Sequence, residues 1–175
     1  MAVSVRDEWF DQQVLDLLDD VHVLTLATFH HDTGPWAADV FFARNGLDLV
    51  FLSSARSRHA QDLAADARCA VTIHPESPTW QSIRGVQLRG RARAVTGAVE
   101  IARLLGAYFG RFPFAQAIVG NPVGATARAA GARPYVFTPE WVRLIDNTRG
   151  FGRPFEAAIR DGVIAHAEQR VVPPV

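Results

Sequence analysis

The sequence predicts a mainly β (α+β) fold, an antiparallel barrel with helices on its periphery. At least six segments either alternate apolar and polar residues or form short apolar runs, and most are joined by short turns. Only three or four segments have helical spacing, and no internal repeat is visible. Short adjacent strands in this proportion favour an antiparallel barrel over a doubly wound sheet.

The first third of the chain predicts one helix and three strands. Apolar residues recur at helical spacing within residues 5–20, which predicts an amphipathic helix. The segment after it is apolar on both faces, as in a strand that is buried on two sides. The pair Asn45-Gly46 is a strong hairpin signal between the second and third strands. These strands are predicted over residues 21–29, 35–43 and 47–54.

The middle of the chain predicts two more helices and the remaining strands. A short helix is predicted at about 57–66, and Thr96 is expected to cap a later helix. Further strands are predicted over residues 67–74 and 83–95, and a final strand pair within residues 135–147.

Two segments lack a strong pattern. Residues 120–134 are rich in Gly, Ala and Pro, which is typical of a surface loop, and a lid over a site is the alternative. The apolar residues after Phe155 could pack on a partner subunit or fray. We therefore divide the chain into one domain, residues 1–155, and a C-terminal extension, residues 156–175.

The composition excludes several classes of function. Basic and acidic residues number 18 each, so no net charge favours nucleic acid or an anionic membrane as a partner. No apolar run reaches the roughly 18 residues of a membrane helix, and the N-terminus lacks the pattern of a signal peptide. All the basic side chains are arginines, so a P-loop and a pyridoxal phosphate Schiff base, which both need lysine, are excluded in their usual forms.

The single cysteine gives a further expectation. Cys69 cannot form an internal disulfide, which is compatible with a reducing, cytoplasmic location. It lies within an apolar alternation and is expected to be an inert core thiol.

The end of the third predicted strand has the pattern of an anion site. The strand ends in Ser53 and Ser54, and a helix begins almost at once, with Ser57 as its expected N-cap. Arg58 and His59 follow in the first turn, where cationic side chains oppose the helix dipole unless an anion is bound. Serine hydroxyls, free backbone N–H groups and an arginine together form a phosphate cradle. A solvated arginine at an ordinary helix start is the alternative.

The strand predicted over residues 83–95 carries a row of arginines on one face. Period-two alternation places Gln87 with this row and opposite the apolar face. The row could contact a dinucleotide, nucleic acid or only water, and the zero net charge argues against nucleic acid. Gly85 and Gly90 would permit bends, bulges or the close approach of a planar ligand. The arginines are Arg89, Arg91 and Arg93.

Residues 145–152 are a third candidate. Asn147 and the threonine after it can hydrogen-bond a polar ring edge, and an Asx-type turn explains the segment equally well. The cluster His30-His31-Asp32 lacks a second His or Cys pair at metal-ligand spacing, so no metal site is predicted. No nucleophile elbow and no dinucleotide-binding glycine motif occurs, and no catalytic side chain is predicted.

Four segments stand in a defined order along the chain: SRHAQ at 57–61, IRGVQLRG at 83–90, RFPF at 111–114 and IDNTRGFG at 145–152. In this order they resemble the pyridoxamine 5′-phosphate oxidase-like FMN-binding split-barrel superfamily, closest to its YhbP-type branch. They cover roughly residues 20–155 in the order of that superfamily. The resemblance implies an antiparallel six-stranded split β-barrel.

The resemblance also implies the cofactor, its site and a partner. It implies that the FMN phosphate lies at the strand end and helix start, with His59 where lysine often stands, and that Gln87 lies near the isoalloxazine or ribityl chain. It further implies a homodimer with FMN shared across the interface. The cofactor-binding residues that it implies are Ser53, Ser54, Ser57, Arg58, His59, Gln87 and Asn147.

The expected function is that of an FMN-dependent oxidoreductase acting on a small molecule, in which the flavin carries the chemistry. The long arginine- and histidine-bearing C-terminal segment of true pyridoxamine-phosphate oxidases is not found, so that activity is not expected. One alternative is a protein that holds flavin, deazaflavin or haem without turnover, with His22, His59 or His74 as candidate haem ligands. Another is a ligand-free dimeric module on the same fold.

Overall fold

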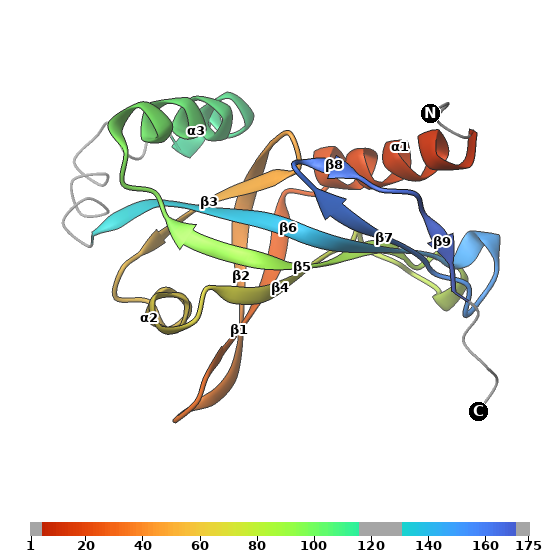
Figure 1. Ribbon diagram of the computed structural model, residues 1–175, viewed down its shortest axis with the longest axis horizontal. Helices are drawn as coiled ribbons and strands as arrows, with labels where there is room; N and C mark the ends of the chain where they lie inside the picture. Colours follow the sequence, from red (N-terminus) through yellow and green to blue (C-terminus); the bar gives the residue numbers. More distant parts are fainter. Residues whose placement is uncertain (1–4, 116–130, 171–175) are drawn as a thin grey trace.

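The computed structural model describes residues 5–115 and 131–170. Its strands form one antiparallel sheet, with helices on the periphery (Figure 1). The helices are α1 (Val5–Asp20), α2 (Arg58–Ala65) and α3 (Ala98–Arg111), with the short 3₁₀ turns η1 (Trp80–Ser82) and η2 (Asn147–Arg149). The strands are β1 (Val23–His30), β2 (Gly34–Asn45), β3 (Asp48–Ser54), β4 (Arg68–Ile73), β5 (Arg84–Ala94), β6 (Ala132–Asp146), β7 (Phe155–Arg160), β8 (Val163–Ile164) and β9 (Glu168–Gln169).

Six of these strands close into a ring. Their hydrogen-bonded order is β3-β2-β1-β4-β5-β6, and β6 pairs in turn with β3. Every pairing around the ring is antiparallel. The prediction of a mainly antiparallel β-fold with peripheral helices is therefore confirmed.

The turn between β2 and β3 is the hairpin that the sequence predicts. Asn45 pairs with Asp48 across this turn. Gly46 has a φ of +66°, a left-handed conformation that glycine adopts without the steric strain of a Cβ. The Asn45-Gly46 signal therefore places the end of β2 correctly.

Strand β6 differs most from the prediction. Instead of a strand pair within residues 135–147, one continuous strand runs from Ala132 to Asp146. Its first residues pair with β3, and residues 141–144 pair with β7, while β5 follows most of its length. The strand is long because it both closes the ring and carries the sheet beyond it.

A bulge between Arg89 and Gly90 interrupts the pairing of β5 with β6. A Cβ on Gly90 would lie 2.2 Å from the carbonyl oxygen of Thr138. A Cβ on Gly85 would likewise lie 2.8 Å from the carbonyl oxygen of Ile73. Close approach of two backbones therefore accounts for both glycines, and a planar ligand is not needed to explain them.

The core lies inside the ring and beneath α1. The apolar stripe of α1 is fully buried there, as its helical spacing predicts. Strand β7 adds three side chains to the same cluster, so the first part of the predicted C-terminal extension continues the sheet. The buried residues of α1 are Phe10, Val14, Leu17 and Leu18, and those of β7 are Phe155, Ala157 and Ile159.

The start of α3 also differs from the prediction. Its N-cap is Gly97, not Thr96, and the Gly97 carbonyl accepts the backbone N–H of Ile101 at 2.8 Å. Of the predicted loop at 120–134, residues 120–130 lie outside the described part of the chain, while residues 132–134 already belong to β6. Within the described residues, no helix has the length and apolar character needed to cross a membrane.

Candidate functional site

Three polar side chains meet where β3 ends and α2 begins. The Ser53 hydroxyl lies 2.6 Å from Nε2 of His59 and 3.0 Å from the hydroxyl of Ser57. We call Ser53, Ser57, His59 and the N-terminus of α2 the β3–α2 cradle. The structure thus brings together three of the residues that the sequence predicts as a phosphate site, whereas Ser54 and Arg58 make other contacts.

Ser57 is the N-cap of α2, as predicted. Its hydroxyl accepts the backbone N–H of Ala60 at 3.3 Å, and its carbonyl accepts the first helical N–H, that of Gln61, at 3.1 Å. The N–H groups of Arg58 and His59 come before this first helical donor, so the helix itself offers them no carbonyl partner. These are the groups with which a helix N-terminus binds an anion.

Ser54 shapes the turn next to the cradle. Its hydroxyl accepts the backbone N–H of Arg56 at 3.2 Å, and its carbonyl accepts the Ser57 hydroxyl at 2.9 Å. Ser54 therefore fixes the turn in which Arg56 lies, while Ser53 and Ser57 face each other.

His59 is the most buried member of the cradle, with 8% of its surface exposed. Its ring packs edge-on against Phe51, which is itself stacked on Tyr135. This burial lowers the pKa of His59 below its ordinary value, and the nearby carboxylate of Asp62 opposes the shift only in part. The imidazole is therefore neutral at neutral pH and acts in hydrogen bonding rather than as a charge.

Arg58 is occupied by contacts within the protein. Its Nε donates to Asp62 at 3.1 Å, and its Nη2 donates to the Thr33 hydroxyl at 2.5 Å and the Thr33 carbonyl at 3.2 Å. Asp62 is buried and also accepts the hydroxyl of Thr28 at 2.7 Å. Arg58 thus ties α2 to the β1–β2 hairpin, and its guanidinium points to that hairpin rather than into the cradle.

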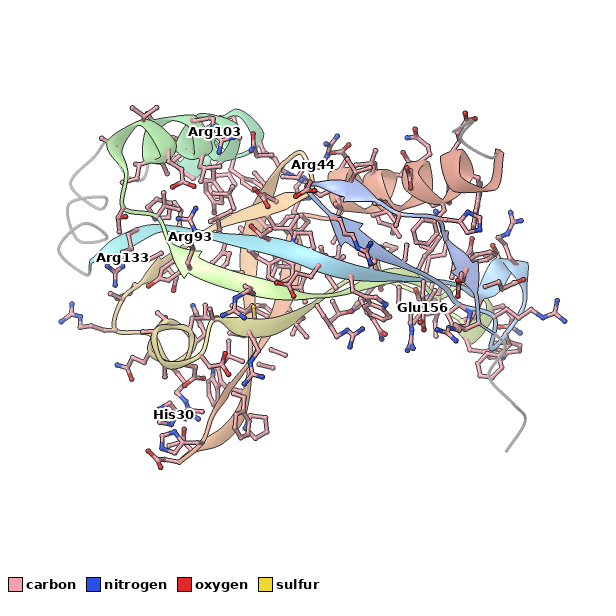
Figure 2. The ribbon with its side chains drawn as sticks, in the orientation of Figure 1. His30, Arg44, Arg93, Arg103, Arg133 and Glu156 are labelled. Atoms are coloured by element: carbon pink, nitrogen blue, oxygen red, sulfur yellow. The ribbon has the colours of Figure 1, made fainter. Side chains whose placement is uncertain are left out.

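Arg133 is the cationic residue that sequence reasoning missed. It is the direct partner of Ser53 in the β3–β6 register, and opposite residues in an antiparallel pair leave the sheet on the same face. Figure 2 shows Arg133 at the start of β6, on the side of the molecule that carries α2. Its Nε lies 3.4 Å from the hydroxyl of Tyr135. No local pattern could have found Arg133, because its place depends on a pairing between distant segments.

Gln87 lies in a different part of the sheet. It is exposed on β5, in the predicted row with Arg89, and lines an open cavity of about 510 Å³. There the Arg89 guanidinium lies 4.2 Å from the ring centroid of Trp141, and Arg143 pairs with Glu156. The alternation predicted for β5 is confirmed, and it separates Gln87 from the core.

Gln87 and the cradle cannot contact one small ligand within a single chain. Gln87 pairs with Arg143 of β6, whereas Ser53 pairs with Arg133. Ten residues of extended strand between these two positions correspond to about 33 Å. Figure 2 shows Arg133 and Glu156 towards opposite ends of the sheet.

Asn147 lies farther still from the cradle, just after β6. Its side-chain amide donates to the Trp80 carbonyl at 2.7 Å, and its backbone N–H donates to the Ile83 carbonyl at 2.9 Å. It therefore joins η2 to η1. The Asx-type turn that the sequence leaves open is formed by Asp146, whose carboxylate accepts the backbone N–H of Thr148 at 3.1 Å. Phe151, 75% exposed, packs edge-on against Trp80 beside it.

The sequence and the fold agree with one family. A family model described as pyridoxamine 5′-phosphate oxidase matches residues 10–146, so the chain belongs to that family. Within it, the chain is similar to the UPF0306 protein YhbP of Salmonella paratyphi C, with 32% identity over 134 residues, which are 75% of this chain and 82% of that protein.

Solved structures support the same fold. A haem-binding protein from Mycobacterium smegmatis superposes with a TM-score of 0.65 and 22% identity, over 83% of this chain and 57% of that one. The matched region is therefore little more than half of that protein. HutZ, a haem storage protein from Vibrio cholerae, superposes with a TM-score of 0.60 and 16% identity, over 74% of this chain and 89% of that one.

Proposed function

We propose that the protein binds FMN, with its phosphate in the β3–α2 cradle, and acts as a flavin-dependent oxidoreductase on a small molecule. One observation carries this proposal. Ser53, Ser57 and the N-terminus of α2, whose first N–H groups have no helical partner, meet at the end of β3, and Arg133 is the cross-strand partner of Ser53 on the same face of the sheet. Backbone N–H groups, hydroxyls and an arginine are the donors that bind a phosphate.

The tautomer of His59 decides what Ser53 offers an anion. With its proton on Nε2, the imidazole donates to the Ser53 oxygen, and the Ser53 hydroxyl hydrogen is free to point elsewhere. The adjacent Ser57 oxygen and a phosphate oxygen are then the two acceptors within reach. A neutral His59 therefore supports the phosphate through Ser53 and does not contribute a charge.

The proposal includes a homodimer. Gln87 and the cradle lie too far apart in one chain to contact the same flavin, so Gln87 would act on the cofactor of a partner subunit. When bound, FMN supplies the transfer of hydride or electrons. The residues of this chain bind and orient it, and we assign no acid or base among them.

The proposal is tested by comparing FMN with riboflavin, which lacks the phosphate. Fluorescence titrations of the purified protein are expected to show tight binding of FMN and much weaker binding of riboflavin. Ser53→Ala should weaken FMN binding by about 1 kcal/mol, the net value of one hydrogen bond, and leave riboflavin unchanged. Thr96→Ala, which removes an exposed hydroxyl before α3, is the matched control and should bind FMN as the wild type does.

Two results would contradict the proposal. Equal affinity for FMN and riboflavin would show that the cradle does not bind the phosphate. Absence of FMN binding to a correctly folded protein would leave the fold without this cofactor, and the ligand-free dimeric module would become the better interpretation.

Haem is a second candidate ligand, favoured by the description of both solved structures as haem proteins and by an aromatic surface in this chain. His22 lies on the surface with its ring centroid 5.7 Å from that of Phe112. Phe112 contacts Phe41 and Phe114, which are 46% and 51% exposed. An imidazole beside exposed aromatic rings suits a planar, apolar ligand that carries a metal. His59 suits this role less, because its Nε2 is bonded to Ser53.

Titration with haemin separates the two candidates. A Soret shift that disappears in His22→Ala and persists in His74→Ala would support haem at this aromatic surface. A shift that both variants retain would exclude His22 as its ligand.

A further inference from the structure

The turn between β1 and β2 gathers three metal-ligating side chains that the proposed function does not use. His30, His31 and Asp32 each offer one donor atom, and these three atoms lie within 4.8 Å of one another. Nε2 of His31 is 2.9 Å from one carboxylate oxygen of Asp32, and Nδ1 of His30 is 3.9 Å from the other. Figure 2 shows His30 at the far end of the hairpin, away from the body of the sheet.

The backbone of this turn is held in place. The N–H of Thr33 donates to the His30 carbonyl at 3.3 Å, which closes the turn. Arg58 donates to both oxygens of Thr33, and Arg58 is itself paired with the buried Asp62. The donor atoms therefore project from a fixed backbone, which reduces the conformational entropy lost when they bind an ion.

The donor set selects a class of ion. Two imidazole nitrogens and one carboxylate oxygen suit late first-row divalent ions such as Zn²⁺, whereas Mg²⁺ and Ca²⁺ prefer oxygen ligands alone. Bonds of about 2.0–2.1 Å in a tetrahedral Zn²⁺ site place the ligand atoms roughly 3.4 Å apart. Nδ1 of His30 accepts the backbone N–H of Asp32 at 3.3 Å, so an ion bound through this atom would displace that hydrogen bond. The side chains of His31 and Asp32 are 79% and 66% exposed, which leaves them room to move towards the ion.

We propose that His30, His31 and Asp32 bind a divalent transition-metal ion such as Zn²⁺ at the tip of the β1–β2 hairpin. Three protein ligands leave a coordination position open to water or to a further ligand. The sequence argued against a metal here because a second His or Cys pair is missing. In the structure a second pair is not needed, because one tight turn brings the donor atoms of three consecutive side chains within 4.8 Å of one another.

Calorimetric titration of ZnCl₂ into chelator-treated, tag-free protein tests the proposal. The wild type is expected to bind one ion per chain. His31→Ala and Asp32→Asn should each weaken that binding by tenfold or more, by analogy with the loss of one ligand from a three-ligand site. Both side chains are exposed, so both variants should fold, which far-UV circular dichroism verifies. His74→Ala, which removes an exposed histidine on another loop, is the control and should bind like the wild type.

Three outcomes would overturn the proposal. The first is absence of stoichiometric Zn²⁺ binding by the wild type. The second is unchanged binding by His31→Ala and Asp32→Asn. The third is an equal loss in His74→Ala, which would show that the ion binds to histidines of the surface without a defined site. None of these outcomes bears on FMN, because the test uses the metal alone.

Discussion

Ser53 and Arg133 are direct partners across β3 and β6, and their side chains lie on the same face of the sheet. Ser53 belongs to the segment that the sequence singles out, whereas Arg133 comes from a segment predicted as a loop. Arg58, the arginine expected at this site, is instead bonded to Thr33 and Asp62. The pairing of β3 with β6 therefore places a cationic residue beside Ser53, whereas the arginine at the helix start is bound elsewhere.

The first prediction concerns Arg133. Arg133→Ala should weaken FMN binding by about 1.5–3 kcal/mol, because charge-assisted hydrogen bonds to a phosphate have that magnitude. Riboflavin binding should not change. The measurement is a pair of fluorescence titrations, with Arg103→Ala on α3 as the matched exposed-arginine control. Equal losses for FMN and riboflavin would show that Arg133 does not act on the phosphate.

The second prediction concerns the contact of α2 with the hairpin. Arg58→Ala should lower the free energy of unfolding by roughly 2 kcal/mol, because the buried Asp62 loses its charged hydrogen-bond partner. Arg56→Ala removes a neighbouring exposed arginine and should change it by less than about 0.5 kcal/mol. Urea denaturation measures both. If Arg58→Ala kept full stability but lost FMN affinity, Arg58 would turn to the phosphate when the ligand binds.

The third prediction concerns pH and His59. Burial lowers the pKa of His59 in the folded state below the ordinary value of 6.5. Below that value the unfolded chain takes up a proton that the folded chain does not, so stability falls as the pH decreases from 6.5 to the folded-state pKa. Urea unfolding between about pH 5 and 8 should show this decline in the wild type. His59→Gln should flatten it, whereas Thr96→Ala, which removes an exposed hydroxyl that does not titrate, should keep the wild-type slope.

The fourth prediction concerns Gly90. Gly90→Ala should lower the free energy of unfolding by about 1–3 kcal/mol or more, because the new Cβ would overlap the carbonyl oxygen of Thr138. Gly106→Ala is the control. Nothing lies within 4 Å of a Cβ at Gly106, and the same substitution inside α3 should stabilise the protein by up to about 1 kcal/mol. Changes of the same sign in thermal denaturation would refute the role of Gly90 in the bulge.

The fifth prediction concerns Cys69. Burial raises the pKa of its thiol from the ordinary 9.0 to about 12. Since the thiolate is the reactive form, the folded protein should react with a thiol reagent at mildly alkaline pH about a thousandfold more slowly than the unfolded chain. Labelling with and without urea measures the ratio. Similar rates in both states would mean that β4 opens readily around Cys69.

Local patterns predicted much of the fold and half of the candidate site. The alternation in β5, the hairpin at Asn45-Gly46 and the cap at Ser57 each depend on neighbouring residues, and all three are confirmed. The meeting of Ser53, Ser57 and His59 follows from one strand end and one helix start. Sequence spacing was sufficient for these features because each is completed within a few residues.

The features that the sequence missed depend on contacts between distant segments. Arg133 lies beside Ser53 only because β6 closes the ring, and the continuous course of β6 depends on its pairing with both β3 and β7. The contact of Arg58 with Thr33 was missed for the same reason, because Thr33 lies in the β1–β2 hairpin, far from α2 in the sequence. The structure at such residues depends on which distant strands pair, and a single sequence does not reveal that pairing.

The β3–β6 pairing also bears on how the molecule is assembled. Strands β3 and β6 are the two ends of the six-stranded order, and their pairing joins segments that are far apart in the sequence. We therefore expect this pairing to form late and slowly in folding. Ser53 belongs to β3 and Arg133 to β6, so each strand of this late pairing contributes one of the two residues. An anion held by both residues would link the two strands, and by mass action it would favour the closed ring over any form in which the ring has opened. The free energy of unfolding would then increase with the fraction of cradles that hold an anion.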